Sequence, residues 1–112
     1  MDKLLVVWKS DDDIDINNFI TPFACNSKTK GWFDDVEVLI WGASAHKIKE
    51  DKLAQEKVVK IVNSGAMVFA CKYCADKVEA TDVLESLGVT VIYTGVYLSE
   101  KMKDPDYKVI TI

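Results

Sequence analysis

Two cysteines three positions apart are the residues of this sequence best suited to chemistry. Cys71 ends an apolar run, and Cys74 follows one helical turn later. A helix that starts near Lys72 would present free amides and the positive end of its dipole to the Cys71 sulfur, which favours a thiolate. Lys72 and Lys77 would add positive charge nearby. The spacing predicts a reactive thiol at Cys71; the alternative is a cysteine that is simply buried at the end of a strand.

The C-x-x-C spacing also has two other interpretations. A thioredoxin-type dithiol works beside a cis-proline, but Pro22 and Pro105 lie elsewhere in the sequence, and the dipeptide between the cysteines is not of the Gly-Pro kind. A zinc site would need Cys25 and His46 as further ligands, and no second C-x-x-C or H-x-x-x-H accompanies them. We expect Cys25 to be a packing residue, His46 to lie on the surface, and the site to hold no metal.

Glycine and aspartate patterns argue against a phosphate enzyme. Neither G-x-G-x-x-G nor G-x-x-x-x-G-K-[ST] occurs in the sequence. Asp11, Asp12 and Asp13 could hold Mg²⁺ through carboxylate oxygens, but acidic residues just before a helix more often cap its amino end. We therefore expect no cofactor.

Five apolar runs predict the strands that position these residues. The runs cover residues 4–8, 36–41, 66–71, 89–93 and 109–112. The first four are nearly continuous in apolar residues, which is typical of parallel strands buried on both faces. Helical spacing of apolar residues over 16–23 and 54–62 lies between them, and Pro22 should end or kink the first of these helices. Glu50 and Asp51 should open the second, and Gly65 should follow it.

Two further helices are expected near the carboxyl terminus of the chain. Thr81 can cap one over residues 82–87, and a last short helix should cover residues 99–103. Strands that alternate with helices predict an α/β fold, a three-layer α/β/α sandwich with a five-stranded parallel sheet, in a single domain over residues 1–112.

Ligands bind at the carboxyl ends of the strands in such sheets. The residues expected to line a substrate site there, beside Cys71 and Cys74, are Asp11, Trp41, Ser44, Lys72, Tyr73 and Gly95.

Composition restricts the class of protein. The 112 residues are 49% hydrophobic and 29% charged, as in one ordinary globular domain. No apolar run approaches the ~18 residues of a membrane span, and the start is too short for a signal peptide, which predicts a cytoplasmic protein without a membrane partner. Its three cysteines should then remain thiols. A net charge of −4 and the absence of arginine make nucleic acid an unsuitable partner.

Three parts of the chain resemble a known family. They are residues 70–77 (ACKYCADK), residues 32–44 (WFDDVEVLIWGAS), and Gly88-Val89 followed by residues 95–100 (GVYLSE). In this order they resemble the DsrE-like sulfur-relay family, and the match is to its small stand-alone branch. The TusD-type pattern C-x-A-A-x-x-R-R-G-V differs in having alanine at Cys74, arginine at Lys77 and glycine at Glu79.

The resemblance implies a function for Cys71. In sulfur carriers such as the TusD and DsrE subunits, a cysteine after the third strand accepts sulfane sulfur as a persulfide, and Cys71 occupies the matching position. It also implies sulfur donor and acceptor proteins or small sulfur compounds as partners, and a homo-oligomer. Cys74 could resolve Cys71 into a disulfide or merely pack.

Two alternatives remain open beside sulfur transfer. The chain could be a non-catalytic module that binds a small ligand in a pocket lined by Trp8, Trp41, Tyr73 and the loop at Gly95. It could also be a structural subunit of an oligomeric assembly. In either case, and in the oligomer that the resemblance implies, Trp32 or Phe33 is expected at a subunit contact.

Overall fold

The computed structural model describes all 112 residues and contains one five-stranded sheet. The strands are β1 (Lys3–Trp8), β2 (Asp35–Ile40), β3 (Met67–Cys71), β4 (Thr90–Ile92) and β5 (Tyr107–Thr111). Their order is β4-β3-β2-β1-β5, and every pairing is parallel. The predicted five-stranded parallel sheet is confirmed, with strand ends that differ by one or two residues.

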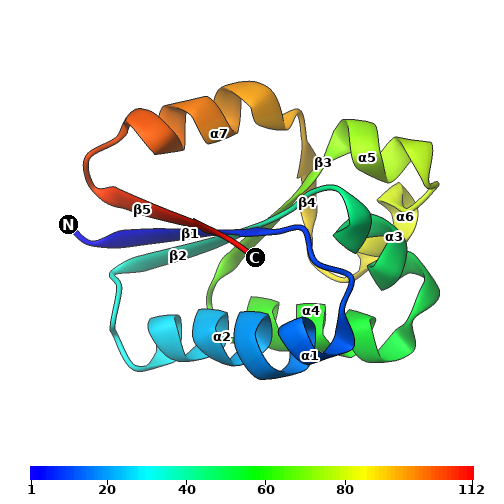
Figure 1. Ribbon diagram of the computed structural model, residues 1–112, viewed down its shortest axis with the longest axis horizontal. Helices are drawn as coiled ribbons and strands as arrows, with labels where there is room; N and C mark the ends of the chain where they lie inside the picture. Colours follow the sequence, from blue (N-terminus) through cyan, green and yellow to red (C-terminus); the bar gives the residue numbers. More distant parts are fainter.

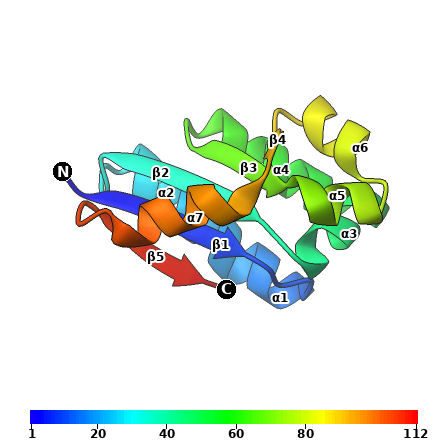
Figure 2. The same ribbon diagram turned by 90° about the horizontal axis from the view of Figure 1, so that it is seen from above.

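Helices cover both faces of this sheet, as the predicted three-layer sandwich requires (Figure 1). The helices are α1 (Asp13–Asp15), α2 (Thr21–Thr29), α3 (Ala43–Glu50), α4 (Lys52–Asn63), α5 (Lys72–Lys77), α6 (Thr81–Ser86) and α7 (Thr94–Lys103). Helices α1, α2 and α4 lie on one face and α7 lies on the other, while α3, α5 and α6 gather near the carboxyl ends of β2 and β3 (Figures 1 and 2). None of these helices is long and apolar enough to pass through a lipid bilayer.

The two faces of the sheet bury unequal cores. On the face of α2 and α4, side chains such as Trp8, Ile20 and Ile61 are fully buried in one large apolar cluster. Under α7 the buried cluster contains only Leu5, Val7 and Leu39. Helix α7 therefore covers fewer buried apolar residues than α2 and α4 do, and fewer apolar contacts hold it on the sheet.

The first helical segment runs through the expected break at Pro22. A π-helix (Ile16–Ile20) precedes α2, and the Thr21 amide donates to the Ile16 carbonyl five residues earlier. Pro22 then falls in the first turn of α2, directly after the change from π-helix to α-helix. The helical segment therefore does not end at Pro22, and its helix type changes at Thr21, one residue before the proline.

Two other helical predictions need correction near the site. Residues 43–50, for which the sequence predicts no helix, form α3, which carries His46 at its surface. Thr81 does not cap α6; its hydroxyl donates to Asp76 Oδ1 at 2.7 Å instead. The cap at Asp51 is confirmed, since its carboxylate accepts from the amides of Leu53 and Ala54 at the start of α4.

Helix α7 begins at Thr94, five residues before the predicted start at Ser99. Its first turn contains Gly95 and Val96, which have low helix propensity and hide the start in the sequence. Thr94 is the one buried residue of α7. The early start places the first turn of α7 directly at the end of β4.

Candidate functional site

Cys71 lies where β3 ends and α5 begins. Its backbone is extended, and the helix starts with the next residue, Lys72. Cys71 is buried, with 5% of its surface exposed. In the sheet Cys71 pairs with Ile92 of β4, two residues before Thr94. The ends of β3 and β4 thus bring Cys71 and Thr94 to the same edge.

Hydrogen bonds at this edge favour the thiolate of Cys71. Burial by itself would raise the pKa of the thiol, but the Thr94 side chain, the amide and thiol of Cys74 and the amide of Tyr73 interact with the sulfur and lower the pKa below its ordinary value. These donors are neutral, and each stabilises the negative sulfur more than the neutral one. The predicted direction of the pKa shift therefore agrees with the structure.

Of the two predicted causes, the free amides at the start of α5 are confirmed, whereas the lysine charges are not among the causes. Lys72 forms an ion pair with Asp76 at 3.0 Å, and Asp76 also accepts from Thr81. The Lys77 ammonium lies over the Tyr73 ring, 5.3 Å from its centroid. Both lysines are committed to partners other than Cys71, so the expected contribution of lysine charge to the thiolate is replaced by that of the hydrogen-bond donors.

Cys74 behaves in the opposite way. Burial raises the pKa of Cys74, and the hydrogen bond to Cys71 and the negative charge on Cys71 raise it further. The amide of Gly42 and the side chain of Trp41 lower it, but the net shift is upward. The thiol of Cys74 therefore keeps its proton when Cys71 ionises. Gly42 has φ +75° and ψ −135°, a conformation that is essentially restricted to glycine, and this conformation lets its amide reach the Cys74 sulfur.

Ser44 and Trp8 lie inside the protein and have no exposed surface. Ser44 is fully buried, and its hydroxyl donates to the carbonyl of Trp8 at 2.6 Å and to that of Trp41 at 3.2 Å. Trp8 is also fully buried, and its indole Nε1 donates to the Ser10 carbonyl. The expectation that these two residues contact a ligand is wrong. Both hold together the loops that follow β1 and β2.

The remaining predicted residues lie at or near the surface. Asp11 is exposed in the loop after β1, and its neighbour Asp12 caps α1 by accepting from the amides of Ile14 and Asp15, as the capping interpretation predicts. Tyr73 and Gly95 are exposed, one beside Cys71 and the other beside Thr94. An added Cβ at Gly95 would meet open space.

Cys25 and His46 are not gathered with the cysteine pair into a group that could hold a metal ion. Cys25 packs in the large core on the other face of the sheet, where burial raises its pKa. His46 is exposed on α3, 4.0 Å from Glu50.

The sequence-based site did not include Thr94 as a functional residue. Its signal in the sequence is a single polar residue at the end of a strand-like run, next to Gly95, which is among the predicted site residues. The pairing of β3 with β4 is what gives this threonine its place beside Cys71.

Comparisons with known proteins give one informative result. No protein-family model matches the chain, and no curated protein matches it in sequence. A solved structure, described as that of a conserved protein of unknown function, BT1422 from Bacteroides thetaiotaomicron, superimposes with a TM-score of 0.94 over 99% of this chain and 95% of that one. The two sequences are 31% identical. The chain therefore belongs to the same family as BT1422.

Proposed function

We propose that the protein is a cytoplasmic DsrE-like sulfur-transfer protein that carries sulfane sulfur as a persulfide on Cys71. The observation that carries this proposal is the group of donors that lowers the pKa of Cys71, since the thiolate is the nucleophile in sulfur exchange. Cys74 supports it as a protonated hydrogen-bond donor to the anion. The same donors would stabilise the persulfide anion that forms at this position.

The backbone at Glu79 supports the resemblance on which the proposal also draws. Glu79 has φ +56° and is the one residue other than glycine with a positive φ. The TusD-type pattern has glycine at this position, and glycine is the residue that favours such a conformation. A positive φ at Glu79 is compatible with the glycine of the TusD-type pattern at this position.

The proposed reaction is a balanced exchange of one sulfur atom. The Cys71 thiolate attacks the terminal sulfur of a donor persulfide and forms a new S–S bond, while the S–S bond of the donor breaks and the donor leaves as a thiolate with the electron pair. An acceptor thiolate then attacks the terminal sulfur on Cys71 and releases the Cys71 thiolate. No external oxidant or reductant is consumed.

Intact-mass spectrometry tests this reaction. After treatment with cysteine persulfide, the protein is expected to gain one sulfur atom, which peptide mapping finds on Cys71. Cys71→Ser should abolish the gain, and Cys25→Ser, which changes a buried cysteine in the other core, should retain it. A persulfide found on Cys25, or on no cysteine, would exclude the carrier function.

The same spectrum separates two roles of Cys74. If Cys74 resolves the persulfide, a Cys71–Cys74 disulfide forms and hydrosulfide leaves. The product is then lighter than the untreated protein by two hydrogen atoms. If Cys74 only donates a hydrogen bond, the persulfide persists. We expect the second result, because the raised pKa keeps Cys74 from acting as a thiolate. A thiolate at Cys71 without sulfur uptake would favour the alternative, a non-catalytic ligand-binding or structural subunit.

We also propose a homo-oligomer with Trp32 in a subunit contact. Trp32 is 53% exposed, whereas Phe33 packs against the large core and is the less suitable of the two. Trp32→Ala is expected to weaken self-association by about 2 kcal/mol or more if the indole is central to the contact. Light scattering at micromolar concentration measures this, with Met102→Ala as a control at an exposed apolar residue of α7. A monomeric unmodified protein would contradict the oligomer.

A further inference from the structure

A buried carboxylate lies under α7, away from the cysteine pair. Glu37 is in the middle of β2, where its neighbours are apolar, and its side chain is 7% exposed. A charged side chain is costly to bury unless partners replace its water. Glu37 therefore needs close partners, and the structure supplies three.

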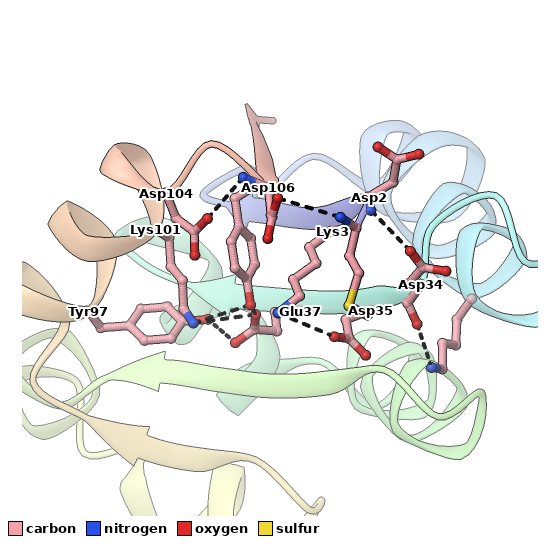
Figure 3. A network of polar contacts seen from close by, with 12 residues as sticks. Asp2, Lys3, Asp34, Asp35, Glu37, Tyr97, Lys101, Asp104 and Asp106 are labelled. Atoms are coloured by element: carbon pink, nitrogen blue, oxygen red, sulfur yellow. Dashed lines mark hydrogen bonds and ion pairs between the residues drawn. The ribbon is translucent and has the colours of Figure 1, made fainter.

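The partners of Glu37 come from α7 and β5 (Figure 3). The Tyr97 hydroxyl donates to Oε1 at 2.8 Å, and the Tyr107 hydroxyl donates to Oε2. The Lys101 ammonium lies 3.8 Å from Oε2 and donates to the Tyr107 hydroxyl at 3.2 Å. Tyr97 and Lys101 are four residues apart on α7, so one face of this helix is attached twice to a single carboxylate on the sheet.

These polar contacts matter because α7 has little else to hold it. Thr94 is its one buried residue, and Tyr97 and Leu98 are only half-buried against the small apolar cluster of this face. The Tyr97 ring also packs on Phe69 of β3, with centroids 5.1 Å apart. Thr94 is three residues before Tyr97, less than one turn of a rigid helix. A shift or rotation of α7 at Tyr97 must therefore move Thr94.

We propose that Glu37 is a positioning residue for the cysteine site: by anchoring Tyr97 and Lys101 it fixes α7 on the sheet, and so holds Thr94 beside Cys71 where β4 and β3 end. The inference rests on the proposed function only in taking Cys71 as the nucleophile. The inference explains why β2 carries a carboxylate at residue 37, a buried position between two apolar residues.

The two tyrosines that bind Glu37 stay protonated while Cys71 titrates. Burial and the neighbouring carboxylate raise the pKa of both Tyr97 and Tyr107, so their hydroxyls remain protonated donors. Lys3 lies over the Tyr107 ring and 3.8 Å from Asp35, beside the same network. A change in the pH profile of Cys71 thus reports the position of α7 and not the ionisation of Tyr97 or Tyr107.

The experiment follows alkylation of Cys71 by iodoacetamide as a function of pH in the full chain, with peptide mapping to separate the three cysteines. Tyr97→Phe and Glu37→Gln are expected to move the Cys71 profile to higher pH and to slow its reaction at neutral pH several-fold. Tyr93→Phe is the matched control, because it removes an exposed tyrosine hydroxyl just before α7 that takes no part in the contacts of Glu37. Its Cys71 profile should stay unchanged.

Two further measurements make the test decisive. In a Thr94→Val background, Tyr97→Phe should have no additional effect on Cys71, because the hydroxyl through which α7 acts is gone. Cys25, buried in the other core, reports general opening of the fold, and its rate should not change. An unshifted profile in Tyr97→Phe, an equal shift in Tyr93→Phe, or additive effects with Thr94→Val would overturn the inference. The alkylation experiment does not measure persulfide formation. If Cys71 formed no persulfide, the conclusion about Glu37 and the Cys71 pKa would therefore still hold.

Discussion

Thr94→Val is expected to slow alkylation of Cys71 at neutral pH by about tenfold or more, because hydrogen bonds to charged groups contribute roughly 1.5–3 kcal/mol. Valine matches threonine in shape and removes only the hydroxyl. The Thr94 side chain is the foremost of the groups that lower the pKa of Cys71, and burial opposes them. Without the hydroxyl, the effect of burial is opposed by fewer donors, so the pKa of Cys71 should rise. Less thiolate should then be present at neutral pH.

Two variants control this experiment. Thr94→Ser keeps the hydroxyl and should keep most of the rate. Thr90→Val makes the same substitution at an exposed position of β4 and should leave the Cys71 profile as it is. A Thr94→Val protein whose Cys71 reacts like the unmodified one would mean that the backbone amides of α5 are sufficient for the thiolate.

Trp8→Ala is expected to lower the free energy of unfolding by about 3–5 kcal/mol, as truncation of a fully buried tryptophan typically does. Trp8 belongs to the large apolar core, and its indole also satisfies the Ser10 carbonyl. The variant would leave both a cavity and an unpaired carbonyl. Urea denaturation followed by circular dichroism measures the loss.

Met102→Ala is the matched control, since Met102 is a large apolar residue that is exposed on α7. It should change the free energy of unfolding by less than about 0.5 kcal/mol. If Trp8→Ala were tolerated equally well, the interior position of Trp8 would be wrong, and the pocket expected from the sequence would again be available.

Neutral donors, more than charged side chains, define the chemistry of the cysteine site. A lysine beside the sulfur would lose much of its effect to screening by salt, whereas hydrogen bonds at a buried edge are less sensitive to salt. The ion pair of Lys72 with Asp76 leaves the polar groups of α5, α7 and the Gly42 turn as the neighbours of the two sulfurs. The geometry of these groups depends on where the helices pack on the sheet. Glu37, by anchoring α7, therefore influences Cys71 without touching it.

The amino-acid sequence by itself determined the strands, the parallel sheet and the place of Cys71 at the end of β3. These features follow from local periodicity and from residues such as Asp51 and Gly65, whose effects act within one helical turn. The caps at Asp12 and Asp51 were predictable for the same reason. Helices with weak local signals were not, as the late predicted start of α7 shows.

Only the tertiary structure decided which residues meet. Thr94 reaches Cys71 because β4 pairs with β3, and Tyr97 and Tyr107 reach Glu37 across 60 and 70 residues of chain. Ser44 and Trp8 looked available in the sequence, but the packing of the loops after β1 and β2 buries both. Periodicity specifies which face of an element is apolar, whereas strand order and helix placement specify its neighbours, and these depend on the free energy of the whole fold.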